Sequence, residues 1–189
     1  MPPGAIGSLR LQRGGPLSGY FQPVRIRAPK GARIALAEEG GFQGVESDSV
    51  LVGMQVGLVY HMRVADFAPD SSQEVFPTVE VIDRLYPPAG LALRYPIPIE
   101  LTADELTMAA DGMFVTRVIY VENPNQALPV NELPDEQQWV EAPHGADPLA
   151  VADEMGRPVA ILRIGARYPM ATSSTFDACS PPLLHYNAH

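Results

Sequence analysis

The chain has 189 residues, which is long enough for one domain with a substantial hydrophobic core. Its 13 basic and 22 acidic residues give a formal net charge of -9, which argues against a nucleic-acid backbone or an anionic membrane as the main partner. Twenty prolines, most of them between periodic segments, favour a protein of strands and loops over a helix bundle.

The first segment, residues 1–22, is predicted to be an extended N-terminal arm. It holds three prolines and five glycines, so it cannot bury enough apolar surface alone to offset the entropy of ordering it. Its start has two arginines but no apolar run, so we do not expect an intact signal peptide. Leu17, Tyr20 and Phe21 are apolar enough to dock, either on their own domain or on a neighbouring subunit.

A β-domain is predicted for residues 23–169. Val24 with Ile26, and Ile34 with Leu36, alternate with polar or small residues and predict two short strands. The alternation from Val50 to Val64 predicts one long strand. Its expected core face carries Val56, Leu58, Tyr60, Met62 and Val64. Further extended segments are predicted over 75–85, where Pro77 indicates an edge or a strand start, and over 95–99, where two prolines exclude helix.

The stretch 101–121 carries the strongest local signals in the chain. Thr102 and Glu105 have the spacing of a capping box, and Leu101 with Leu106 that of a hydrophobic staple. Gly112 is predicted to end the helix as its C′ residue. The β-branched and aromatic run from Phe114 to Val121 then predicts a buried core strand.

After this stretch, residues 122–146 are predicted to form a long surface loop, with Trp139 as its large apolar residue. Asp147 and Pro148 predict the cap and first residue of a second helix, which stops at Gly156 before a strand from Val159 to Ile164. Residues 170–189 show no period, so we expect an irregular C-terminal tail, within which Phe176, Leu183, Leu184 and Tyr186 favour burial.

Candidate chemical groups do not form a recognisable catalytic set. Cys179 is the only cysteine, so no internal disulfide and no cysteine-based metal site is expected. Asp66, Asp70 and Glu74 could supply oxygen ligands to calcium, but their spacing does not match an EF-hand. His61 and Arg63 share a strand face, for which a solvated sheet surface is the simpler interpretation.

The remaining candidates point the same way. Glu80 and Asp83 do not share a strand face, so they are a poor acid and base pair. No phosphate-binding loop, nucleophile elbow or histidine zinc motif is present, and no apolar run is long enough for a membrane span. We therefore expect neither an enzyme nor a bound cofactor.

Three segments carry a family resemblance: FPTVEVID from Phe76, IPIELT from Ile97 and FVTRVIY from Phe114. With them, the region from Val50 to Gly165 resembles a group of uncharacterised secreted proteins from planctomycete-type bacteria. The resemblance implies an extracellular or cell-envelope setting and no assigned reaction, so it carries over no functional residues.

These patterns predict a mainly β, antiparallel β-sandwich with two short helices and extended arms at both ends. The first functional hypothesis is a non-enzymatic structural subunit that self-associates through its arms into a filament, tube or layer. The alternative is a monomeric binding module for a glycan or an envelope protein, with Trp139 as a stacking platform. Residues expected to take part in assembly or binding are Leu17, Tyr20, Phe21, Trp139, Phe176, Leu183, Leu184 and Tyr186.

Overall fold

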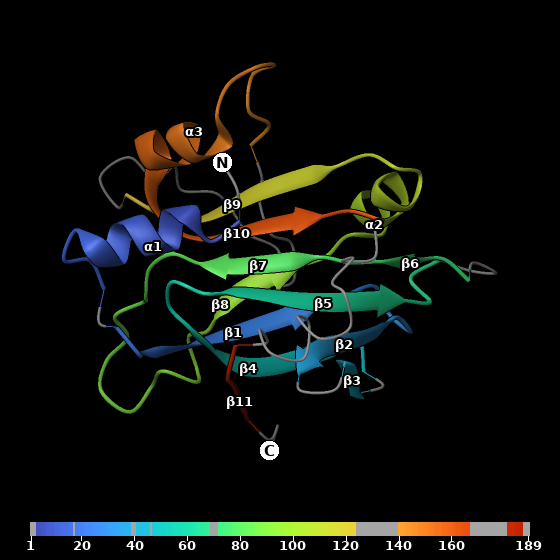
Figure 1. The fold of residues 1–189 in the computed structure, drawn as a ribbon, viewed down its shortest axis with the longest axis horizontal. Helices are drawn as coiled ribbons and strands as arrows, with labels where there is room; N and C mark the ends of the chain where they lie inside the picture. Colours follow the sequence, from blue (N-terminus) through green and yellow to red (C-terminus); the bar gives the residue numbers. More distant parts are fainter. Residues whose placement is uncertain are drawn as a thin grey trace.

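In the part of the chain that the structure describes, the protein folds as a sandwich of two β-sheets with three helices of eight residues each (Figure 1). This computed structural model describes residues 3–16, 18–38, 41–45, 47–68, 72–123, 140–166 and 181–186. Strand pairing is antiparallel except for one pair, so the predicted class, a mainly β antiparallel sandwich, is confirmed. Among the described residues, no helix has the length and hydrophobicity needed to span a bilayer.

The smaller sheet has four strands and draws on both ends of the chain. In spatial order it contains β11 (Leu183–His185), β4 (Ser49–Gln55), β1 (Phe21–Arg27) and β8 (Ile97–Glu100). The central pair β1 and β4 is antiparallel, with Val24 opposite Val52. The pair β1 and β8 is parallel, with Val24 opposite Ile97.

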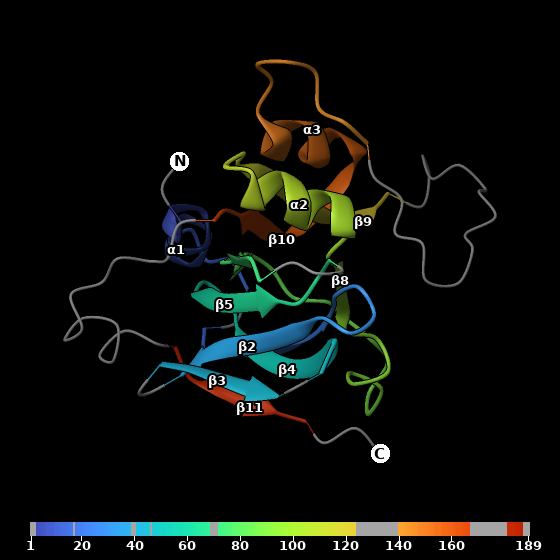
Figure 2. The same ribbon diagram turned by 90° about the vertical axis from the view of Figure 1, so that its right-hand side faces the viewer.

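The larger sheet has seven strands, all paired antiparallel. In spatial order it contains β3 (Gly41–Val45), β2 (Arg33–Glu38), β5 (Val59–Ala65), β7 (Thr78–Val81), β10 (Gly156–Ile164) and β9 (Val115–Glu122), with β6 (Glu74–Val75) beside β5. Figure 2 shows β3 and β11 at one end of the molecule and two of the helices at the other.

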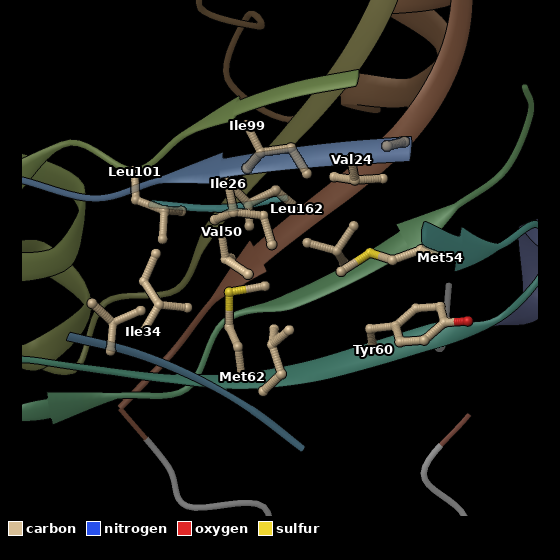
Figure 3. Close-up of a cluster of buried hydrophobic side chains, with 14 of the residues drawn as sticks. Val24, Ile26, Ile34, Val50, Met54, Tyr60, Met62, Ile99, Leu101 and Leu162 are labelled. Atoms are coloured by element: carbon tan, nitrogen blue, oxygen red, sulfur yellow. The ribbon is translucent and has the colours of Figure 1, made fainter. Parts of the chain in front are cut away.

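The core lies between the two sheets, where the inward residues of both meet (Figure 3). Val24 and Ile26 of β1 and Ile99 of β8 pack against residues of the other sheet such as Met62 of β5 and Leu162 of β10. All five side chains are fully buried, which is the period-two pattern expected of a half-buried strand. At about 25 cal/mol per Å² of apolar surface, this burial is the main stabilising term of the fold.

The predicted long strand from Val50 to Val64 is wrong, because the chain breaks at Gly57 into β4 and β5. Gly57 has φ +91°, a conformation that glycine adopts without the strain of a side chain. The chain thereby passes from the smaller sheet to the larger one. The predicted face is nevertheless buried at Tyr60, Met62 and Val64, because the alternation is correct on each side of the break.

The helix α2 (Ala103–Ala110) confirms the prediction from its caps. The Glu105 N–H donates to Thr102 Oγ1 at 3.3 Å, and Glu105 Oε2 accepts from the Thr102 N–H at 3.1 Å, which completes the capping box. At the other end Gly112 has φ +93°, and the Met113 N–H donates to the Met108 carbonyl at 3.0 Å. This is a Schellman ending, which satisfies carbonyls that the helix leaves open.

The strand β9 that follows is an edge strand, so its predicted place in the core is wrong. Ile119 is the one buried residue of the strand, and Phe114, just before the strand, is 69% exposed. The run is apolar enough for a core strand, but β9 pairs on one side only, with β10. Pattern alone does not distinguish a central strand from an apolar edge.

The predicted extended arm over residues 1–22 contains the helix α1 (Ala5–Gln12), and its last two residues already belong to β1. Neither a side-chain cap nor an acidic first turn supports α1. It is held by tertiary contacts: Ile6 packs with Ile82 and Ile161, and the Gly7 N–H donates to Glu80 Oε1 at 2.9 Å. A helix stabilised mainly by its neighbours leaves little signal in its own sequence.

The helix α3 (Pro148–Met155) and the strand β10 confirm the second predicted helix and strand. Asp147 Oδ1 accepts the Leu149 N–H at 3.0 Å, and Pro148 occupies the first helical position. Gly156 lies against β9, where an added Cβ would overlap the Val121 carbonyl oxygen. That close approach requires glycine at the start of β10.

The predicted irregular tail also contains a regular element, since residues 183–185 form β11 on the free edge of β4. Leu183 faces Met54 and Leu184 faces Gly53 in this pair. A three-residue strand with no periodicity of its own cannot be distinguished from a loop in the sequence. Its position is decided by the edge that it covers.

Candidate functional site

Five of the eight predicted assembly residues lie in the two terminal segments on either side of β4, and we call them the chain-end cluster: Tyr20, Phe21, Leu183, Leu184 and Tyr186. Phe21 begins β1, Leu183 and Leu184 belong to β11, and Tyr20 and Leu183 pack on the main core. Gly53 lies beneath the cluster: a Cβ there would be 2.8 Å from the Tyr186 hydroxyl, 3.0 Å from Leu184 Cβ and 3.3 Å from Phe21 Cβ. The two terminal segments therefore dock on the protein's own sheet.

Hydrogen bonds fasten β11 in addition to its ladder with β4. The Tyr60 hydroxyl donates to the Pro182 carbonyl at 3.0 Å and accepts the Gln55 N–H at 2.7 Å. The Tyr186 N–H donates to the Leu51 carbonyl at 3.3 Å, and His185 Nε2 lies 3.0 Å from Glu38 Oε1. Because Glu38 belongs to β2, this last contact joins β11 to the other sheet.

Two tyrosines of this region have perturbed acidity. Burial raises the pKa of Tyr60 to about 12, and the bond from Gln55 offsets part of that effect. Burial also raises the pKa of Tyr186, with a further contribution from nearby Tyr20. Both hydroxyls are therefore neutral near pH 7, which is the form that can donate a hydrogen bond.

The other three predicted residues, Leu17, Trp139 and Phe176, lie outside the residues that the structure describes, as does Cys179. The stacking platform at Trp139 therefore stays a prediction. Most of the predicted surface loop also lies in this part of the chain.

The candidate calcium ligands are engaged with arginines where the structure describes them. Asp66 Oδ2 pairs with Arg33, and Glu74 Oε1 lies 3.2 Å from a guanidinium nitrogen of Arg63. Asp70 lies outside the described residues. Within the described ranges, no group of three histidine, cysteine or acidic side chains is arranged to hold a metal ion. His61 of β5 is half-buried, and this burial lowers its pKa.

Glu80 and Asp83 belong to two different ion pairs, so they do not form an acid and base pair. Glu80 is fully buried, with Oε2 3.0 Å from a guanidinium nitrogen of Arg163. Asp83 Oδ2 pairs with Arg157 and lies 3.7 Å from Arg10 of α1. Both carboxylates thus connect the ends of β7 and β10 to α1.

Arginines and tyrosines stack beside the second ion pair. The Arg84 guanidinium lies over the rings of Tyr20 at 5.1 Å and Tyr86 at 4.4 Å. The Arg157 guanidinium also lies over the Tyr86 ring, 5.4 Å from its centroid. Such cation–π contacts contribute about 0.5–1 kcal/mol each where they are exposed. The stack links Tyr20 of the chain-end cluster to the α1 end of the molecule.

An open pocket that the sequence analysis did not identify lies at the β8 edge of the smaller sheet. We call it the arginine groove. It has a volume of about 400 Å³ and is lined by Arg25 and Arg27 of β1, by Arg94 and Tyr95 of the loop before β8, and by Pro98 and Glu100 of β8. The spacing of two between Arg25 and Arg27 was a usable signal, because it places both side chains on the outer face of β1.

A second open pocket of about 410 Å³ lies where α3 meets β9. Glu122, Asp153, Glu154 and Arg157 are among its lining residues. It adjoins Asn123, after which the described chain is interrupted. An acidic lining without a further indication of a ligand does not define a site.

Comparisons with protein families, with curated proteins and with solved structures found no match for this chain.

Proposed function

We propose that the protein is a non-enzymatic structural subunit of the cell exterior, and that copies associate by exchanging the strand β11. The observation that carries this proposal is the three-residue strand that covers the edge of β4 and comes from the far end of the sequence. The same contacts could form with the β4 of a neighbouring copy. This would be β-augmentation between subunits by a domain swap.

The two edges of the smaller sheet support this choice of strand. The Leu101 N–H donates to the Arg27 carbonyl at 2.7 Å, so the N–H groups of alternate residues in β8 point toward β1 and those between point to the open edge. Of the outward residues, Pro98 has no N–H, and the Glu100 carbonyl already accepts from Arg117 at 2.8 Å. The β8 edge is therefore protected against strand addition, whereas β11 occupies the opposite edge.

The first test compares the full chain with a variant that lacks residues 181–189. Light scattering and electron micrographs over a wide range of protein concentration should show oligomers or polymers for the full chain and monomers for the variant. A variant that lacks only residues 187–189 keeps β11 and Tyr186, so it should assemble like the full chain. A full chain that stays monomeric at every concentration would rule out the proposal.

A second measurement separates exchange from other modes of association. The variant without residues 181–189 should bind a synthetic peptide of sequence PPLLHY, residues 181–186, because its β4 edge is open. The same peptide with aspartate at both leucine positions should not bind, because Leu183 packs on the core. Assembly without binding of this peptide would point to a contact that does not use β11.

A further inference from the structure

The arginine groove has a local charge opposite to that of the whole chain. Three guanidinium groups, from Arg25, Arg27 and Arg94, share it with one carboxylate, from Glu100. The chain as a whole has a formal net charge of -9. Like charges gathered in this way repel one another, so their grouping favours an anion between them.

Two of the three arginines are available to a ligand. Arg27 lies 3.5 Å from Glu100, which neutralises one charge. Arg25 and Arg94 make no ion pair and no side-chain hydrogen bond with any residue that the structure describes. A guanidinium presents a planar fork of donors that matches a carboxylate or a sulfate, so two free forks can bind two anionic groups or both sides of one.

The rest of the lining is mostly apolar, and part of it is exposed. Tyr95 is 49% exposed, and Pro96 and Pro98 lie beside it. An exposed tyrosine ring next to proline rings offers a flat surface on which the apolar face of a sugar ring can pack. The pocket is open, so a chain of sugars can pass through it.

We infer that the arginine groove binds an anionic glycan, a saccharide chain with carboxylate or sulfate groups. The guanidinium groups of Arg25 and Arg94 bind the charged groups, and Tyr95 packs against a sugar ring. An extended peptide fits less well, because the open edge of β8 lacks the N–H of Pro98 and its Glu100 carbonyl is already bonded. Nucleic acid fits less well, because its duplex carries one charge about every 1.7 Å and would face the acidic remainder of the surface.

Binding is measured on the full chain with oligosaccharides as probes. Oligogalacturonate supplies carboxylates, a heparin oligosaccharide supplies sulfates, and neutral dextran supplies neither. Calorimetry should detect binding of at least one anionic oligosaccharide and none of dextran, and the two anionic probes identify which group is recognised. A single-stranded oligonucleotide serves as a further polyanion, and binding that is equally tight for it would overturn the inference.

The variants Arg25→Ala and Arg94→Ala should each weaken binding about tenfold or more, since each loses a charge-assisted contact. Arg94 is exposed in a loop, so its loss should leave the fold intact, which thermal unfolding verifies. The matched control is Arg33→Ala, which removes the same charge from β2 of the other sheet. Unchanged affinity in both groove variants, or an equal loss in the control, would refute the site.

The groove contains no residue of β11, so this test is independent of assembly. If the protein binds the oligosaccharide but stays monomeric, the proposed glycan site is supported and the strand-exchange proposal is refuted. If the protein polymerises but binds none of the anionic oligosaccharides, strand exchange is supported and the glycan site is refuted.

Discussion

Glu80 is a fully buried carboxylate whose two oxygens have separate partners. Oε1 accepts the Gly7 N–H of α1, and Oε2 pairs with Arg163 of β10. Breaking a buried pair is costly because the remaining charge has no counter-charge in a medium of low dielectric constant. A surface pair contributes far less, since water screens it.

At the residue scale, we therefore expect Glu80→Gln to lower the free energy of unfolding by about 3 kcal/mol, as measured by urea denaturation. Glutamine retains an acceptor for the Gly7 N–H, so the loss of stability measures the effect of removing the negative charge. The double variant Glu80→Gln with Arg163→Met should recover part of the loss. Glu74→Gln, at the exposed pair with Arg63, should change stability by less than about 1 kcal/mol. Equal effects at Glu80 and Glu74 would contradict this account.

At the scale of single elements, β11 depends on the Tyr60 hydroxyl, whose pKa is raised to about 12. Since the folded pKa lies above the unfolded value of about 10, its contribution to stability is complete below pH 10 and is lost as the pH rises toward 12. We expect the free energy of unfolding to fall by about 2 kcal/mol over this range through Tyr60 alone.

The variant Tyr60→Phe isolates this effect. It should be less stable at pH 7, because the Gln55 N–H and the Pro182 carbonyl lose their partner. Its stability should then fall less steeply than that of the wild type above pH 10. The measurement is urea denaturation at several pH values. If the two proteins lose stability in parallel above pH 10, ionisation of Tyr60 does not cause the loss of stability at alkaline pH.

The elements also show where the sequence was sufficient. The helix α2 could be predicted because both of its ends are specified locally, by Thr102 with Glu105 and by Gly112. The helix α1 could not, because its support comes from Glu80, which is distant in sequence. The break at Gly57 was missed since alternation continues on both sides of it. Local sequence signals specify where a helix begins and ends, whereas contacts with distant residues specify where an element lies in the fold.

The same distinction applies to the candidate sites. The apolar residues near both ends were identified from composition, and five of them do meet at β4. Their docking within one chain could not be deduced, because local patterns of residues do not indicate which edge of a sheet is left open. The arginine groove was missed because Arg25 and Arg94 are far apart in sequence and come together only through the parallel pair of β1 and β8.

At the scale of the whole molecule, α1 is an addition to a sandwich that is complete without it. Ile6 belongs to a small separate cluster with Ile82 and Ile161 rather than to the main core. We expect a variant that lacks residues 1–16 to keep its strand content by circular dichroism. It should lose about 2–4 kcal/mol of unfolding free energy through the lost burial of Ile6 and the lost partner of Glu80.

A variant that lacks residues 1–22 provides the contrast. It also removes Phe21 and Gln22 from β1, and the Gln22 side chain accepts the Leu85 N–H at 2.7 Å. This variant should lose more strand content and unfold at lower urea than the shorter deletion. Equal behaviour of the two would mean that the start of β1 adds nothing to the sheet.

The order of strands in the smaller sheet has a consequence for the rate of folding. The neighbouring strands of this sheet come from segments near residues 24, 52, 97 and 184, so each strand pair closes a long loop of chain. In the larger sheet, several neighbouring strands are close in sequence. Closing long loops is entropically costly and slows folding. Among the described strand pairs, β11 with β4 spans the greatest separation in sequence, so we expect this pair to form last. Until it does, a newly made chain exposes the edge of β4 to its neighbours.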